Sequence, residues 1–221
     1  MQRPGGFRHQ VSGLILMTVS MLVTERGEEN GTRGRGRPRC EVARKRILEA
    51  ALESLDEVGF ASTTTDVIAE RAGASKATIY RWWPTKAALL LEALRDVVAQ
   101  ELPFPDTGDL KEDLRGQLRN FVTLLTGRRG RVLKAFVAAS QSDAEVAAAF
   151  LNVWIIPRRA EAKTVLQRHQ QEGRLAAEAD LELILDVLYG PLYYRLLMGH
   201  GELSPQYADE ITELVLTGLL R

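Results

Sequence analysis

Apolar residues recur along most of the chain at intervals of three and four positions, the spacing of one buried helix face. A short helix fits between Ser75 and Pro84. The other predicted helices cover residues 41–58, 65–72, 85–101, 110–126, 132–140, 144–171, 181–198 and 206–220. No stretch alternates convincingly at the two-residue period of a strand, so we expect an all-α protein without a sheet.

Individual residues in this pattern predict which helix faces are buried and where the helices end or bend. The inward face of the first helix is expected to carry Val42, Ile47, Ala51, Leu55 and Val58. Gly59 should end that helix, and Pro157 should bend the long one, because proline lacks an amide hydrogen. Gly127 and Gly130 bracket a basic segment, which is expected to form a turn before the helix at 132–140.

A very short turn joins two of the predicted helices near residue 74. Gly73 is suited to end the preceding helix and Ser75 to cap the next. A turn of this length is typical of a helix-turn-helix, whose second helix enters the major groove of DNA. We call this second helix the recognition helix. Its apolar residues Ala77, Ile79 and Trp83 can hold one face against the domain beneath.

The candidate DNA contacts on this motif are of two kinds. Lys76, Ala77 and Thr78 are expected to read base edges, since side chains near the start of a recognition helix reach farthest into the groove. Phosphate contacts are expected from Thr64, Tyr80, Trp82 and Lys86, and the surface also includes Ser75 and Arg81. A lysine in the first turn of a helix opposes the helix dipole. Lys86 therefore makes more sense facing an external anion than as a local stabiliser.

An Arg-rich arm precedes the predicted motif. The chain balances 29 Lys and Arg against 29 Asp and Glu, but its positive charge is concentrated in residues 33–46. Here Arg35, Arg37 and Arg39 alternate with glycine and proline, a pattern that looks like the Arg-Gly-Arg-Pro core of AT-hook peptides. Such a segment can extend along a narrow minor groove. A solvated basic tail is the alternative.

The motif as a whole resembles the DNA-binding domain of the tetracycline-repressor (TetR) family of bacterial transcription regulators. The matching residues are Gly59, Phe60, Thr63, Thr64, Ile68, Ala69, Ala72, Gly73, Ser75, Thr78, Tyr80, Lys86 and Leu89. The chain departs from the family pattern at Ala74, Ala77, Ile79, Trp82 and Trp83. The resemblance implies a homodimeric regulator, most often a repressor, that a small-molecule effector releases from a palindromic operator.

The last two predicted helices are the expected dimer interface. The helix at 181–198 is apolar on nearly every face, so it must be covered on all sides. Two helices from each of two subunits would cover it as a four-helix bundle, although packing within one subunit is the alternative. The expected interface residues are Leu188, Leu192, Leu196, Ile211, Leu214, Val215 and Leu219.

An effector cavity in the second half of the chain is also implied by the resemblance. The Gly190-Pro191 pair is expected to interrupt its helix and open space between helices. The candidate lining residues are Phe136, Phe150, Trp154, Tyr189, Tyr193, Tyr194 and Met198, with Arg195 and His169 as polar anchors. Taken singly, each aromatic residue is better explained by core packing than by a cavity wall, and only the group as a whole indicates a cavity.

Enzymatic chemistry is not indicated. The three histidines are isolated, the single cysteine lies in the arm, and no metal-ligand spacing, phosphate-binding loop or nucleophile elbow occurs. We therefore expect neither a metal nor another cofactor. The apolar run at 11–23 is too short to span a membrane, and one unpaired cysteine fits the reducing cytoplasm.

These observations divide the chain into three expected regions. Residues 1–40 form a flexible extension with the Arg-rich arm, 41–103 the helix-turn-helix domain, and 104–221 the effector-binding and dimerisation domain. The predicted function is ligand-responsive transcriptional regulation, with double-stranded DNA, a second copy and a small molecule as partners. The alternative is an architectural DNA-binding protein that uses the arm and reads no sequence.

Overall fold

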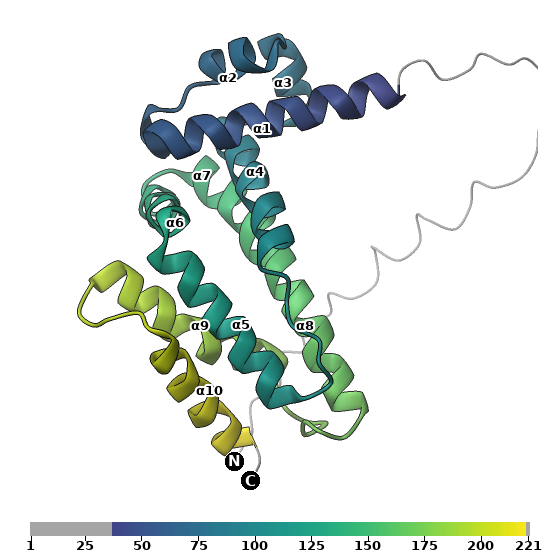
Figure 1. The fold of residues 1–221 in the computed structure, drawn as a ribbon, viewed down its shortest axis with the longest axis vertical. Coiled ribbons are helices and arrows are strands. Elements are labelled where there is room, and N and C mark those ends of the chain that lie inside the picture. Colours follow the sequence, from purple (N-terminus) through teal and green to yellow (C-terminus); the bar gives the residue numbers. More distant parts are fainter. Residues whose placement is uncertain (1–36, 220–221) are drawn as a thin grey trace, which may run out of the picture. The chain divides into compact units, whose positions relative to one another are not determined.

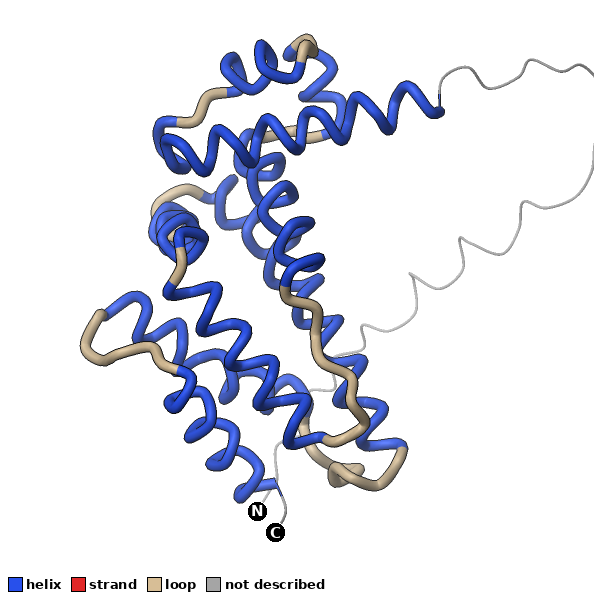
Figure 2. The backbone as a smooth tube through the Cα atoms, in the orientation of Figure 1, coloured by secondary structure: helices blue, strands red, loops and turns tan. Residues whose placement is uncertain are grey.

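The structure, a computed structural model, describes residues 37–219, and within that range every regular element is helical (Figure 1). The N-terminal helices are α1 (Arg37–Ser62), α2 (Thr65–Ala72), α3 (Lys76–Trp82) and α4 (Lys86–Glu101). They are followed by α5 (Leu110–Thr126), α6 (Arg128–Ser140), α7 (Ala144–Ala149), the π-helix η1 (Phe150–Ile155), α8 (Ile156–Gln171), α9 (Leu181–Met198) and α10 (Pro205–Leu219). Figure 2 shows helices joined by loops, which confirms the all-α prediction for the described residues.

Helix α1 carries α2 and α4 on its sides, and α4 runs from the recognition helix α3 into the C-terminal half of the chain (Figure 1). There α4 packs against α7 and η1, while α1 packs against α6. Helix α5 lies among α6, α9 and α10. Buried apolar residues therefore continue across the expected boundary near residue 103, and that boundary stays a prediction.

Helix α1 differs from its predicted face at both ends. Ile47, Ala51 and Leu55 are buried as expected, whereas Val42 and Val58 are exposed, so their inward placement was wrong. Val42 lies in the turns before packing begins at Ile47. Val58 directly precedes Gly59, whose backbone leaves the helical path with φ 77° and ψ 176°. Gly59 thus breaks the helix as predicted, because a positive φ favours glycine.

The long helix predicted at 144–171 is continuous but irregular. It consists of α7, the π-helix η1 and α8 in immediate succession. The irregularity ends two residues before Pro157, at Ile155, rather than being a simple bend at the proline. A π-helical stretch accommodates an extra residue per turn and recurs at functional sites. In this protein, Trp154 and Ile155 of η1 line a cavity.

Two expected breaks are absent from the described helices. Helix α9 continues through Gly190-Pro191, so the predicted interruption was wrong. Because Pro191 has no amide hydrogen, the Val187 carbonyl four residues earlier loses its helical hydrogen bond. Val187 is exposed, so water can donate to that carbonyl instead. Helix α6 begins at Arg128, directly after its N-cap Gly127, so the basic segment expected as a turn is the first turn of the helix.

The segment between α4 and α5 is fastened by the buried carboxylate of Asp113. One oxygen accepts hydrogen bonds from the Thr107 amide at 2.6 Å and hydroxyl at 2.7 Å, and the other lies 3.1 Å from His169 Nε2. Burial alone would raise the pKa of Asp113, but these hydrogen bonds outweigh it and lower the pKa. The carboxylate therefore joins this segment to α5 and α8.

Candidate nucleic-acid interface and ligand cavity

The turn between α2 and α3 has the capping geometry expected from its sequence. Gly73 adopts the left-handed conformation with φ 57° and ψ 41°, and the Ala74 amide donates to the Ala69 carbonyl at 2.9 Å. Ser75 Oγ accepts from the Thr78 amide at 3.1 Å, while Thr64 Oγ1 caps α2 through Val67. These caps fix where each helix begins and ends.

Helix α3 presents its polar residues outward. Ile79 and Trp83 are buried as predicted, while Ala77 is exposed rather than part of the packed face. Lys76 and Arg81 are exposed next to Ala77, and Thr78, Ser75 and Tyr80 complete this surface. Tyr80 is anchored at its hydroxyl, which lies 3.4 Å from Thr65 Oγ1 on α2.

Lys76 pairs with a carboxylate at the start of α2. Its Nζ lies 2.7 Å from Asp66 Oδ1, and both side chains are exposed. The hydrogen bond with Asp66 raises the pKa of Lys76, so the ammonium stays charged at neutral pH. An exposed ion pair is weak enough to exchange for a phosphate or a base edge.

The C-terminal end of the recognition helix is tied to α1 and α4. Trp83 Nε1 donates to Glu92 Oε2 at 2.8 Å, and the Arg44 guanidinium pairs with the other oxygen of Glu92. The same guanidinium lies 5.8 Å from the Trp83 ring centroid. Trp82 is different, since its Nε1 is buried without a partner among the described residues. In this conformation it does not offer the phosphate contact expected of it.

Lys86 is a local stabiliser, contrary to the expectation from the helix dipole. Its Nζ donates to the Phe60 carbonyl at 3.1 Å and the Thr63 carbonyl at 2.9 Å. The ammonium also lies 4.8 Å from the Phe60 ring centroid. Burial lowers the pKa of Lys86. The ammonium has a third N–H, so its phosphate contact stays a prediction.

Replacing Lys86 with methionine should destabilise the fold. Lys86→Met keeps the side-chain length but leaves two backbone carbonyls without a donor, so we expect a loss of about 1–3 kcal/mol in the free energy of unfolding. Urea denaturation of Lys86→Met and of a control, Lys45→Met, measures this. Lys45 is exposed on α1, and its ion pair with Glu49 is long, with 3.8 Å between Nζ and Oε1. Equal unfolding midpoints for the two variants would contradict the proposed role.

The predicted arm contacts fall mostly outside the described residues. Arg35 precedes the described range, and α1 begins at Arg37, but the side chains of Arg37 and Arg39 are not described. Their place in a minor groove therefore stays a prediction.

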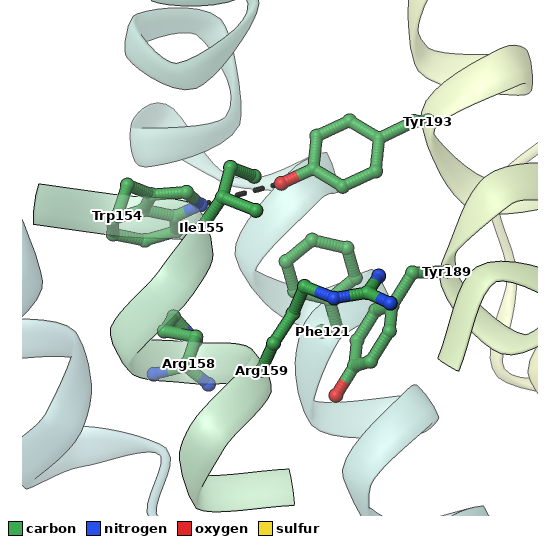
Figure 3. A pocket seen from close by; sticks show the side chains of 7 residues that line it. All are labelled: Phe121, Trp154, Ile155, Arg158, Arg159, Tyr189 and Tyr193. Carbon is green, nitrogen blue, oxygen red and sulfur yellow. Dashed lines mark hydrogen bonds between the residues drawn. The ribbon is translucent and has the colours of Figure 1, made fainter. Parts of the chain in front are cut away.

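A cavity lies between α5, η1, α8 and α9 (Figure 3). It encloses about 60 Å³ of free space and is lined by Phe121, Trp154, Ile155, Arg158, Arg159, Tyr189 and Tyr193. Trp154 Nε1 donates to Tyr193 Oη at 3.3 Å, and the Phe121 and Tyr189 rings meet edge to face at 5.2 Å. Three predicted lining residues, Trp154, Tyr189 and Tyr193, are thus brought together.

The other predicted lining residues, Phe136, Phe150, Tyr194 and Met198, are not among those that line this cavity. Phe136 is buried against Phe60, with ring centroids 4.3 Å apart, while Tyr194 and Met198 are each 60% exposed on α9. The expected polar anchors are also engaged elsewhere. Arg195 lies over the Tyr207 ring, and His169 pairs with Asp113.

Sequence reasoning missed Phe121, Ile155, Arg158 and Arg159 as lining residues. A signal existed for the two arginines, because they follow Trp154 and Ile155 by four residues, one helical turn. Burial raises the pKa of Tyr193 to about 12 and also raises that of Tyr189. Both hydroxyls therefore stay protonated at neutral pH and can donate hydrogen bonds.

Most of the predicted dimer contacts are buried within the single chain. Leu188, Leu192, Ile211 and Val215 are buried within the chain, so their assignment to an interface was wrong. Leu196 is half-buried, Leu214 is exposed, and the Leu219 side chain is not described. The exposed apolar residues of these helices are instead Leu183, Val187, Tyr194, Met198 and Leu214, which we call the α9–α10 face.

Residues 37–219 contain neither a group of metal-ligating side chains nor a helix that could cross a membrane. Among residues 37–219, no three His, Cys, Asp or Glu side chains are grouped to hold a metal ion. No helix in that range has both the length and the apolar character required to cross a bilayer.

Comparison with known proteins adds two family matches. Residues 47–93 match the model described as bacterial regulatory proteins, tetR family, and residues 104–215 match the tetracyclin repressor-like C-terminal domain. The matches thus include the recognition helix and the cavity.

Individual relatives are similar over most of their length. The uncharacterized HTH-type transcriptional regulator YdeS of Bacillus subtilis is 40% identical, covering 84% of this chain and 93% of the relative. The DNA-binding transcriptional repressor TetR of Mycobacteroides abscessus is 30% identical, covering 83% of this chain and 96% of the relative. The crystal structure of the TetR family transcription regulator SCO0332 superposes with a TM-score of 0.75 at 34% identity. The match covers 80% of this chain and 98% of that structure's chain.

Proposed function

The chain belongs to the TetR family of DNA-binding transcriptional regulators, and we propose that it is a repressor released from a palindromic operator by a small-molecule effector. It is a regulator and not an enzyme. The observation that carries the proposal is α3, which is held by buried Ile79 and Trp83 while Lys76, Ala77 and Arg81 stay exposed. The relative described as a repressor supports the direction of regulation.

A homodimer would place two such helices on DNA. The α9–α10 face is apolar and exposed in one chain, and residues 183, 187, 190, 194 and 198 share one side of α9. We propose that a second copy covers this face in a two-fold four-helix bundle. Two recognition helices can then enter successive major grooves, about 34 Å apart, which matches a palindromic operator.

Effector release would act through α4. The cavity is lined by Trp154 and Ile155 of η1, and η1 packs against α4. In its N-terminal half, α4 carries Glu92, which holds Trp83 and Arg44. A ligand that displaces η1 would therefore tilt α4 and change the spacing of the two recognition helices.

Footprinting on the DNA upstream of the protein's own and neighbouring genes tests this proposal. We expect protection of a palindrome that persists in excess nonspecific DNA. The alternative, an architectural protein that binds through the Arg-rich arm, would lose all protection under that competition. Uniform binding along the DNA would contradict the proposed operator recognition.

Lys76→Ala should relax the sequence preference of the recognition helix. Lys76 is exposed at the first turn of α3, where a lysine can donate to guanine. We expect selection from randomised sites to lose the preference at one or two positions per half-site, with discrimination at each falling by about 1–3 kcal/mol. An unchanged motif with a shallower salt dependence would assign Lys76 to a phosphate.

Three finer assignments belong to the same proposal. Residues 41–103 would be the DNA-binding domain and 104–221 the effector and dimer domain. The arm, with Arg35, Arg37 and Arg39, would follow the minor groove beside the operator. The protein would act in the cytoplasm, where bacterial DNA lies.

A further inference from the structure

Arg158 has no hydrogen-bonded anion at the wall of the cavity, where its guanidinium lies 5.7 Å from the Trp154 ring centroid. Its side chain is only 13% exposed, and its Nη1 is buried without a hydrogen-bond partner among the described residues. The nearest carboxylate oxygen, from Glu161, is 4.0 Å from Nη1, beyond hydrogen-bond distance. A buried guanidinium without a hydrogen-bonded anion is costly, so this position is suited to an anion supplied from outside.

The neighbouring Arg159 provides a contrast within the same wall. It donates to Glu182 Oε2 at 2.6 Å and to Asp186 Oδ1 at 2.7 Å, so its charge is already compensated. In Figure 3 the Arg159 guanidinium lies beside the Phe121 and Tyr189 rings, while the Arg158 nitrogens point away from these two rings. Of the two guanidiniums lining the cavity, Arg158 is therefore the one with donors available to a ligand.

The hydroxyls in the cavity are also donors without acceptors. Tyr193 Oη accepts from Trp154 Nε1, and Tyr189 Oη accepts from Gln117 Nε2 at 2.9 Å. Neither hydroxyl proton has an acceptor among the described residues. The cavity wall thus offers several hydrogen-bond donors at its polar positions, and the rest of it is apolar and mostly aromatic.

From the Arg158 guanidinium without a hydrogen-bonded anion, the tyrosine hydroxyl protons without an acceptor and the aromatic side chains of the wall, we infer that the effector is an aromatic carboxylic acid. Its carboxylate binds Arg158 and receives a hydrogen bond from Tyr193 or Tyr189. Its ring packs against Phe121 and Trp154. This inference rests on the proposed function, because it names the class of molecule that would act as effector.

The size of the cavity adds a conformational requirement. An apolar cavity of roughly 150 Å³ accommodates benzene, whereas this one encloses about 60 Å³. An aromatic acid must therefore push the cavity walls apart. Trp154 and Ile155 belong to the π-helix η1, whose hydrogen bonding is less regular than that of an α-helix. Displacement of η1 is the movement that would reach α4.

Matched pairs of probes test the inference by isothermal titration calorimetry. Benzoate and 2-naphthoate are compared with benzamide and 2-naphthamide, which have nearly the same shape without the charge. We expect the carboxylates to bind the parent protein at least about tenfold more tightly than the amides, because hydrogen bonds to charged groups are the stronger ones. No carboxylate binding at millimolar concentration, or equal affinities within pairs, would overturn the inference.

Variants of the two arginines locate the charge. Arg158→Gln should abolish the preference for carboxylates, and Arg158→Lys should restore part of it. Arg159→Gln should retain the preference, because that guanidinium is already paired. We expect Arg158→Gln to melt at or above the parent temperature, since it removes a buried charge without a hydrogen-bonded partner. A carboxylate preference that survives in Arg158→Gln contradicts the inference.

Operator binding, followed by fluorescence anisotropy on the same samples, separates this inference from the proposed function. If the carboxylates bind but do not release DNA, the ligand class stands and the effector role fails. If the protein binds its palindrome but no carboxylate binds, the ligand class fails and operator recognition stands.

Discussion

Gly130→Ala is expected to lower the free energy of unfolding by about 3 kcal/mol or more, the upper part of the range for overpacked positions. A Cβ at this position would lie 1.8 Å from the Leu125 carbonyl oxygen and 2.4 Å from its carbon. Backbone atoms cannot rotate away as a flexible side chain can. The variant must therefore move α6 away from the C-terminal end of α5. Leu125 of α5 and Leu133 of α6 are both buried in this region.

Thermal unfolding at one fixed protein concentration measures this effect. For a chain of this size, about 3 kcal/mol corresponds to a melting temperature lowered by roughly 6–12 °C. Lys134→Ala, one turn further along α6, is the control because Lys134 is exposed. It should change stability by less than about 0.5 kcal/mol. A Gly130→Ala protein as stable as this control would show that the close approach of α5 and α6 is absent in solution.

Val187→Glu should dissociate the proposed dimer and with it the affinity for the operator. Val187 lies at the middle of the α9–α10 face, and a two-fold interface would bury one new carboxylate from each subunit. An unpaired buried charge costs about 3–5 kcal/mol, so the dimer dissociation constant should rise by at least about a hundredfold. A monomer has one recognition helix to place on DNA, so operator affinity should fall with dimerisation.

Sedimentation velocity and operator binding, measured on the same preparations, test this expectation. Leu151→Glu is the matched control, because Leu151 is an exposed apolar residue of η1 outside the α9–α10 face. It should leave the mass in solution unchanged. If Val187→Glu sediments like the parent, the α9–α10 face is not the dimer interface. If both variants become monomeric, the interface includes η1.

Local chemistry in the sequence was sufficient to locate most helices. The predicted ranges 65–72, 110–126 and 181–198 agree with α2, α5 and α9. The caps at Gly73 and Ser75 were also predicted correctly. Helical periodicity, left-handed glycine and side-chain capping depend on a few neighbouring residues, so they can be recognised in the sequence before the fold is known. The spacing of the recognition motif identified the family for the same reason.

The choice of buried face in α9 was decided only by the tertiary structure. This helix is apolar on nearly every side, so its sequence contains no contrast between an inner and an outer face. Packing against α5, α8 and α10 buries Leu188 and Leu192 and leaves Val187 and Tyr194 exposed. The interface prediction consequently named residues of α9 that are buried within the single chain.

Long-range pairing decided the remaining features of the two sites. Lys86 meets carbonyls 23 and 26 residues earlier in the chain, and Trp154 meets Tyr193 from a position 39 residues away. Arg158 is left without a hydrogen-bonded anion, while Arg159 pairs with two on α9. The sequence determines which groups can donate, accept or carry charge. Which of them meet a partner, and which remain free for a ligand, depends on how distant helices pack.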